Sequence, residues 1–317
     1  MQNNYKNILI VGFGASSLNI KAILSSIVTP KLPFYYLDSL DPNAVSRILS
    51  GIELQDTAAF IISKSGNTQE TNILFEYLAT LSCKKIFILS SKADSQLYNL
   101  SRSVKHEWID YAESEGGRFA LLTKPFLDIA EVAGIDTAKL KAASLSTDNG
   151  YIKKIADKWI ENFKNGKRNW VIINYSTQLH GVLLWIRQIV AESLGKNGFG
   201  IMPILAEGTM DQHSQLQLFL DGPDDKFYEI ISCDFNNAPE FDKIAQTQID
   251  HSFKVSAMLK EKNRLVTHSH HKKIDEEFIG QTIATYINIV KIVADIMGFD
   301  PVSQPAVENM KQKSYEN

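Results

Sequence analysis

The stretch Ser63–Thr71, SKSGNTQET, combines the residue types of an anion site. It joins an apolar run to a helical pattern. Its glycine lets the backbone approach a ligand, and the N–H groups at a helix start attract negative charge. The stretch therefore predicts a phosphate cradle. An N-cap arrangement of Thr68 with Glu70 or Thr71 explains the same composition equally well. The sequence lacks the GxxxxGK[ST] pattern, so nothing supports nucleoside triphosphate binding.

A second turn, Gly12-Phe13-Gly14, follows the first apolar run. It resembles the start of a dinucleotide-binding fingerprint, but Ser17 stands where the third glycine belongs. A tight strand-to-helix turn is therefore a better interpretation than a nicotinamide dinucleotide site. A third interpretation, with support between that of the other two, is that the backbone of this turn forms one wall of a sugar-phosphate site.

Both turns belong to a pattern of alternating strands and helices. Apolar runs at residues 8–11, 34–37, 58–62 and 85–89 predict strands, and residues 68–81 have helical spacing. The last two strands and this helix form one strand-helix-strand unit, whose loop is SKSGN. Strands joined by helices run parallel, so the first half is predicted to be an α/β sandwich.

The pattern restarts after the polar segment 142–150, where we place a domain boundary. A helix at 152–163, strands at 170–174, 200–205 and 227–231, and a helix around Val182 to Val190 predict a second α/β sandwich. A long amphipathic helix follows at 275–297. The expected domains are residues 1–145 and 146–297, with a C-terminal helical tail at 298–317.

Composition narrows the class of protein. The chain has 317 residues, 44% of them hydrophobic and 22% charged, as in ordinary globular proteins. A net charge of -3 gives no field that would hold nucleic acid. Cys83 and Cys233 form neither a CxxC pair nor a disulfide framework, which favours a reducing cytoplasm. Without a signal-peptide pattern or a long apolar run, we expect a soluble, unexported protein with no membrane partner.

Five ordered blocks resemble the signature blocks of the phosphoglucose isomerase family: SKSGNTQET, SEGGRFALLT, AESLGK, GTMDQHSQLQLFLDGP and QPAVENMK. The resemblance runs from Gly12 to Lys311, and ESLGK and DQHSQLQL are similar to its bacterial branch. It implies two doubly wound sugar isomerase domains. It also implies reversible isomerisation of glucose 6-phosphate by ring opening and an enediol proton transfer, without a cofactor or metal. The family further implies a homodimer in which His213 of the partner subunit completes each active site.

The resemblance assigns roles position by position. Glu192 matches the base that moves a proton between C1 and C2, His213 the residue that helps open the ring, and Arg118 the arginine facing the enediol. Lys311, in the tail, matches a lysine near the ring oxygen. The phosphate clamp corresponds to Ser63, Lys64, Ser65, Thr68 and Thr71, and other substrate contacts to Gly12, Gly14, Ser16 and Gln304.

These residue types suit the reaction. Moving a proton between adjacent carbons needs one base, and a desolvated carboxylate such as Glu192 serves both directions. Histidine has the pKa nearest neutrality, which suits ring opening by His213. A fixed guanidinium at Arg118, presented by a Gly-Gly turn, would stabilise the enediolate.

Each assignment has a structural alternative. Glu192 and Lys196 are four residues apart and could form a surface ion pair. His213 alone fits an ordinary polar histidine, Arg118 a turn residue and Lys311 a solvated tail lysine. Two other functions stay open: a related aldose-ketose isomerase for mannose or an amino sugar phosphate, and a non-catalytic sugar-phosphate sensor.

The histidines His268, His270 and His271 are interpreted as an exposed cationic turn rather than a metal site. Two features depart from the family. Only about ten residues precede Gly12, so the family's additional N-terminal helical cover is expected to be absent or trimmed. In addition, Ala306 stands where the family commonly has glycine.

Overall fold

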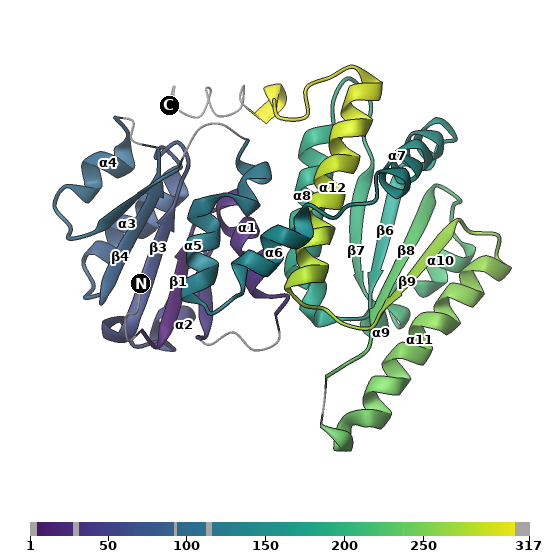
Figure 1. Cartoon of the computed structure of the whole chain (residues 1–317), viewed down its shortest axis with the longest axis horizontal. Helices are drawn as coiled ribbons and strands as arrows, with labels where there is room; N and C mark the ends of the chain where they lie inside the picture. The colour runs from purple at the N-terminus through teal and green to yellow at the C-terminus, as the bar shows by residue number, and fades with distance from the viewer. Residues whose placement is uncertain (1–4, 28–31, 92–93, 112–115, 237, 308–317) are drawn as a thin grey trace. The chain divides into compact units, whose positions relative to one another are not determined.

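The computed structural model describes residues 5–27, 32–91, 94–111, 116–236 and 238–307. The chain divides into two compact units, Met1–Ala138 and Lys139–Asn317. Each unit is built on one parallel sheet with helices on both faces (Figure 1). The prediction of an α/β fold with two parallel sheets is therefore confirmed.

The first sheet has the order β2-β1-β3-β4-β5, and every neighbouring pair is parallel. The strands are β1 (Asn7–Val11), β2 (Phe34–Leu37), β3 (Thr57–Ile62), β4 (Lys85–Ser90) and β5 (Glu107–Asp110). From β1 the chain moves outward to β2 and then returns to β3 on the other side. The strand order therefore reverses between β1 and β3, which is the position where doubly wound sheets place their ligands.

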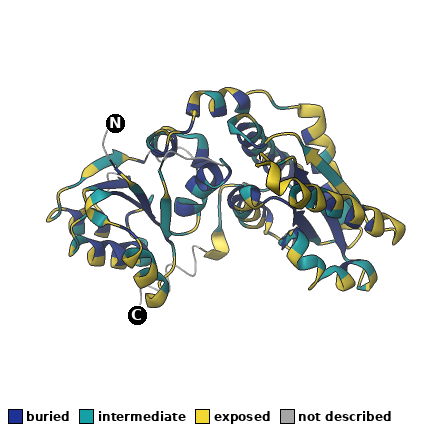
Figure 2. Ribbon diagram, turned by 90° about the horizontal axis from the view of Figure 1, so that it is seen from below, coloured by how far each residue is buried: buried dark blue, intermediate teal, exposed yellow. Residues whose placement is uncertain are grey.

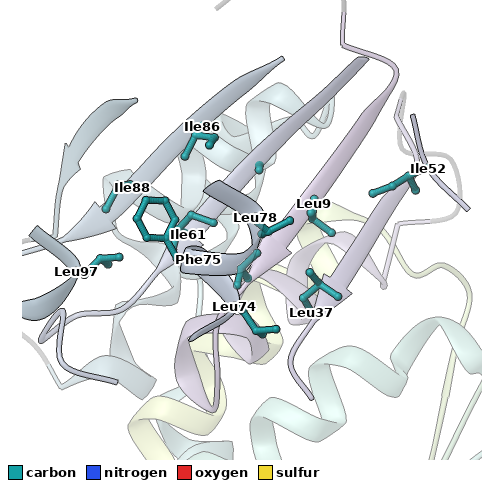
Figure 3. Packing of buried hydrophobic residues seen from close by; sticks show 12 residues of the cluster. Leu9, Leu37, Ile52, Ile61, Leu74, Phe75, Leu78, Ile86, Ile88 and Leu97 are labelled. Carbon is teal, nitrogen blue, oxygen red and sulfur yellow. The ribbon is translucent and has the colours of Figure 1, made fainter. Parts of the chain in front are cut away.

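Helices cover both faces of this sheet because its inner strands are apolar on both sides. On one face, Leu74, Phe75 and Leu78 of α3 pack against strand residues that include Leu9 and Ile61 (Figure 3). The helices of this unit are α1 (Ala15–Leu24), α2 (Pro42–Ser50), α3 (Gln69–Ala79), α4 (Gln96–Ser101) and α5 (Lys124–Val132), with 3-10 turns η1 (Leu54–Asp56) and η2 (Gly117–Leu122).

The second sheet has the order β7-β6-β8-β9 and is also parallel. Its strands are β6 (Asn169–Asn174), β7 (Met202–Glu207), β8 (Lys226–Cys233) and β9 (Val266–His271). One face carries α10 (Leu216–Asp221) and α11 (Asp242–Glu261), whose Phe219, Val255 and Leu259 belong to a buried cluster.

The opposite face of the second sheet carries α7 (Asn149–Lys164), α8 (His180–Leu194) and α12 (Glu276–Met297). There the rings of Trp159, Trp170 and Tyr286 contact one another. Figure 2 shows the resulting pattern, with buried strands and helices exposed along their outer sides. The remaining elements are α6 (Thr137–Ser144), α9 (Gly208–Gln212), η3 (Thr177–Leu179) and η4 (Pro239–Phe241).

Two edge strands, β5 and β9, were not among the predicted strands. The interpretation of His268, His270 and His271 as an exposed cationic turn is wrong, because these residues form the end of β9. Tyr228 to Cys233 of β8 pair with Val266 to His271. Burial also lowers the pKa of His268 and His271, which opposes a cationic state.

Candidate functional site

The two glycine-containing turns of the first unit lie side by side. Gly12 follows β1 and Ser63 follows β3, and these strands are neighbours in the sheet. A methyl group on Gly12 would lie 2.9 Å from the carbonyl oxygen of Ile62 and 2.9 Å from Cβ of Ser16. Gly12, Ser16 and the Ser63–Thr71 loop therefore meet at the reversal point of the sheet, where a ligand is expected in this fold.

The Ser63–Thr71 loop is held in a defined conformation. Gly66 has a φ of +66°, the left-handed region that glycine adopts without strain. The hydroxyl of Ser63 donates to the hydroxyl of Thr68 at 3.0 Å, and the N–H of Asn67 donates to the Ser65 hydroxyl at 3.2 Å. Ser63 and Thr71 are buried, Lys64 and Thr68 are half-buried, and Ser65 is exposed.

The start of α3 bears on the two interpretations of this loop. Thr68 occupies the N-cap position with extended backbone, but its side chain makes no capping hydrogen bond. The hydroxyl of Thr71 is buried without a hydrogen-bond partner among the described residues. The Thr68 side chain therefore leaves the first N–H groups of α3 open, and this geometry favours the phosphate cradle over a simple cap.

Residues that the sequence analysis did not identify hold the Ser63–Thr71 loop through hydrogen bonds and close packing. Ser91 donates to the carbonyl of Lys64 through both its N–H (3.0 Å) and its hydroxyl (2.8 Å). The amide of Asn72 donates to the carbonyl of Gly66 at 3.3 Å. Ser95 lies so close to Gly66 that its hydroxyl would be 2.2 Å from an added methyl group. Such contacts with residues distant in the sequence are visible only in the folded chain.

Arg118 lies at the same edge of the first sheet, in η2. Its exposed fraction is only 3%. The amide of Asn19 on α1 donates to the carbonyl of Gly117 at 2.8 Å, and a methyl on Gly117 would lie 3.5 Å from Cβ of Ala15. Because α1 begins directly after Gly14, the glycine turn and the arginine turn are fixed to one helix.

In the second unit, Glu192 lies in the last turn of α8 and is half-buried. Gln188, one turn earlier, donates its side-chain amide to the Glu192 carboxylate at 3.0 Å. The other amide atom of Gln188, its oxygen, is buried without a partner among the described residues. Gln188 therefore orients the carboxylate, a role that the sequence analysis did not identify.

The chain after α12 docks beside this end of α8. Lys196 donates its ammonium to the carbonyl of Asp300, and the rings of Phe199 and Phe299 lie 6.1 Å apart. Gln304 follows and is half-buried, and its side-chain oxygen has no partner in the described part of the chain. Lys311 lies outside the described residues.

His213 lies on an exposed turn between α9 and α10. Asp211 organises this turn: its carboxylate accepts from the N–H of Glu207 at 2.6 Å and from the Ser214 hydroxyl at 2.7 Å. Burial alone would raise the pKa of Asp211, but hydrogen bonds, including one from Gln215, outweigh it and lower the pKa. The charged carboxylate therefore fixes the turn that presents His213.

Glu192 and His213 lie at opposite ends of the second sheet. Helix α8 runs back across the sheet, so Glu192 precedes β7, whereas α9 and His213 follow it. The six residues of β7 separate the two ends, a span of about 20 Å. In Figure 1, α9 lies at the lower end of the second sheet and the segment after α12 at its upper end. Within one chain, the length of β7 therefore lies between the two side chains.

The histidines of β9 are held by protein groups. The hydroxyl of Ser232 lies 3.0 Å from Nε2 of His268 and 2.9 Å from Nδ1 of His270, and Nε2 of His270 lies 2.9 Å from Asp234. In the part of the chain that the structure describes, no group of three or more metal-binding side chains is placed to hold a metal ion. Within the same residues, no helix is both long and apolar enough to cross a membrane.

The fold matches solved structures over nearly the whole chain. It matches the crystal structure of a hypothetical protein from Thermus thermophilus with a TM-score of 0.80 and 20% identity, covering 98% of this chain and 83% of that one. It also matches a glucose-6-phosphate isomerase from Chlamydia trachomatis with a TM-score of 0.77 and 19% identity, covering 99% and 69%. These similarities concern the fold alone.

Sequence comparison is more specific. The chain is 30% identical to a probable glucose-6-phosphate isomerase of Methanococcus maripaludis, with 99% of this chain and 78% of that protein covered. No protein-family model matches the chain. The relationship to the archaeal protein shows that the chain belongs to the glucose-6-phosphate isomerase family.

Proposed function

We propose that this chain interconverts glucose 6-phosphate and fructose 6-phosphate. The observation that carries the proposal is the alignment of 99% of the chain with a probable glucose-6-phosphate isomerase. The cradle at the reversal point of the first sheet adds independent support, because a sugar phosphate needs an anion site.

The proposed reaction proceeds in two stages. The cradle residues Ser63, Lys64, Ser65, Thr68 and Thr71 bind the phosphate, with the turn of Gly12, Gly14 and Ser16 and the tail residue Gln304 as further contacts. His213 donates a proton to the ring oxygen while the C1 hydroxyl passes its proton to water, so that the bond between C1 and the ring oxygen breaks and the ring opens. Lys311 assists near the ring oxygen.

Isomerisation then moves one proton between the carbons and one between their oxygens. Glu192 removes the first from C2 of the open aldose, which gives an enediolate, and returns it to C1, while the proton of the C2 hydroxyl passes to the C1 oxygen and C2 becomes a carbonyl. Arg118 stabilises the negative charge that develops on the enediol oxygens. Gln188 holds the Glu192 carboxylate in position through its amide.

We also propose a homodimer with shared active sites. This proposal is supported by the separation of Glu192 from His213 across β7 and by the exposure of His213. If both residues act on one sugar, His213 of the partner subunit must supply the ring-opening group. A cytoplasmic location is a further proposal, supported by Cys83 and Cys233, which are both free.

The decisive variant is Glu192→Gln, which preserves shape and removes the base. We expect kcat for glucose 6-phosphate to fall about 100-fold or more in a coupled assay. Glu161→Gln, an exposed change on α7, is the matched control and should leave kcat unchanged. Retention of wild-type turnover by Glu192→Gln would exclude this base.

Substrate choice is tested separately on the wild-type chain. Turnover of glucose 6-phosphate should exceed that of mannose 6-phosphate and glucosamine 6-phosphate. A preference for either of those would identify a related aldose-ketose isomerase. Binding of all three without turnover would identify a sugar-phosphate sensor.

A further inference from the structure

A cavity of about 280 Å³ lies in the second unit, away from every predicted site residue. It is lined by the first two turns of α8, the strands β8 and β9, helix α12 and Tyr151 of α7. An apolar cavity of about 150 Å³ is already large enough to bind benzene. This cavity therefore has room for a ring-sized organic molecule with a polar head group.

The cavity contains a carboxyl group that the proposed reaction does not use. Glu229 lies in the middle of β8 and lines the cavity. The hydroxyl of Tyr286 lies 3.2 Å from one carboxylate oxygen and 3.4 Å from the other. Glu229 forms no ion pair within the described residues, and neither lysine nor arginine lines the cavity. A half-buried carboxylate without a counter-charge is costly, so the cavity favours a positively charged ligand.

The remaining lining fits an organic cation rather than a bare metal ion. Three aromatic side chains, Tyr151, Phe278 and Tyr286, surround the cavity. The faces of such rings attract ammonium groups, and their apolar bodies suit a hydrocarbon group. The hydroxyl of Thr282 offers a further hydrogen-bond acceptor.

We propose that this cavity binds a compact organic ammonium ion, whose charged nitrogen pairs with Glu229 and whose apolar part contacts the aromatic side chains. The ligand is a primary amine in its protonated form, of about the size of a phenyl ring carrying one carbon and one nitrogen. The inference rests on the cavity and is independent of the isomerase activity.

The pKa shifts of the ionisable side chains that line the cavity agree with this geometry. Burial raises the pKa of Glu229 to about 7, although hydrogen bonds from Tyr286 and Trp170 oppose the rise. Burial, followed by the neighbouring His270, lowers the pKa of His271. Burial raises the pKa of Tyr151 and of Tyr286, so both phenols stay neutral. An ammonium ligand favours ionised Glu229, so its affinity should fall about tenfold between about pH 8 and about pH 6.

The experiment compares benzylamine with benzyl alcohol, which has nearly the same shape and no charge, by isothermal titration calorimetry on the full chain. At about pH 8 we expect benzylamine to bind about tenfold more tightly, as a charge-assisted hydrogen bond requires. Glu229→Gln should abolish this preference. Glu161→Gln, an exposed charge change on α7, should preserve it.

A second variant tests the proposal independently, in case Glu229→Gln does not fold. Thr282→Phe fills the cavity without altering Glu229 and should weaken both compounds, while the far-ultraviolet circular dichroism stays that of the wild type. Equal binding of the two compounds to the wild type, or no binding of either, would overturn the proposal. A benzylamine preference that survives in Glu229→Gln would overturn it as well, because the cation would then be held elsewhere.

Discussion

The side-chain amide of Asn19 donates to the carbonyl of Gly117 and thereby attaches the turn that carries Arg118 to helix α1. Asn19 is fully buried, so water cannot replace this hydrogen bond. We predict that Asn19→Ala lowers kcat about tenfold, because a guanidinium that is displaced by a fraction of an ångström stabilises the enediolate less well.

If Asn19 acts by positioning Arg118, the effect of its substitution should be selective. Inhibition by inorganic phosphate, which reports the cradle, should stay within about twofold of the wild type, whereas a general loss of structure would weaken it too. Asn43→Ala on α2, an exposed position, is the control. If kcat and phosphate affinity fall together, Asn19 supports the whole domain rather than the arginine.

Gly66 should tolerate no side chain. Gly66→Ala introduces a methyl group 2.2 Å from the Ser95 hydroxyl and strains a left-handed backbone. We expect the KM for glucose 6-phosphate to rise about tenfold or more and the free energy of unfolding to fall by about 1–3 kcal/mol.

Gly166 provides a matched comparison for Gly66. It also has a positive φ, +79°, but nothing lies within 4 Å of an added methyl group. Gly166→Ala should therefore cost only about 1–2 kcal/mol of backbone strain, measured by urea unfolding, and leave the KM unchanged. A normal KM for Gly66→Ala would contradict the role of this loop in binding phosphate.

Complementation between inactive variants tests the shared active site. Glu192→Gln and His213→Ala should each be inactive alone. After the two proteins are mixed, unfolded and refolded together, half of the dimers should contain both variants, and each of these has one intact site. We expect about a quarter of wild-type activity to return. If no activity returns although mixed dimers form, both residues serve a site within one chain.

Asp275 should link stability to pH. It caps α12 through the N–H groups of Glu277 and Phe278 and pairs with Lys139 at 2.7 Å and Lys273 at 3.0 Å. Burial alone would raise the pKa of Asp275, but the hydrogen bonds from Lys139, Lys273 and Phe278 lower it well below the usual range. A lowered folded-state pKa stabilises the fold above the unfolded pKa of about 4, and this contribution is lost as the pH falls further.

We therefore expect Asp275→Asn to lower the free energy of unfolding by about 1–2 kcal/mol at neutral pH. The difference from the wild type should hold down to about pH 5 and shrink below about pH 4 in urea titrations. Asp157→Asn removes an exposed pair with Lys153 and should cost less than about 0.5 kcal/mol at any pH. A difference for Asp275→Asn that is independent of pH would show that the cap alone matters.

The central strands could be predicted from the sequence because burial on both faces leaves a continuous apolar run. The segment Thr57–Ile62 is buried at every position, and its neighbours in the sheet show the same pattern. The edge strands β5 and β9 escaped prediction for the opposite reason. Glu107–Asp110 and Val266–His271 are half-exposed and polar, and only pairing with the adjacent strand makes them strands.

In the candidate site, too, some features could be predicted from the sequence and others could not. Residue types in ordered blocks pointed to Ser63, Arg118, Glu192 and His213, and the roles of these residues remain predictions. Contacts between distant segments had no local signal: Asn19 with Gly117, Ser91 with Lys64, and the cavity around Glu229. A single glutamate within the predicted strand Phe227–Ile231 offered no clue that helices would enclose it.

The space beside Gly12, where an added methyl group would lie 2.9 Å from the carbonyl oxygen of Ile62, has a thermodynamic consequence. Any larger residue would push apart the two loops that follow β1 and β3. If the Ser63–Thr71 loop binds phosphate as proposed, this close packing fixes the shape of the site before the anion binds, and little chain entropy is lost on binding. Affinity for the phosphate end should then depend on how well the loops fit and hardly at all on how far they must move.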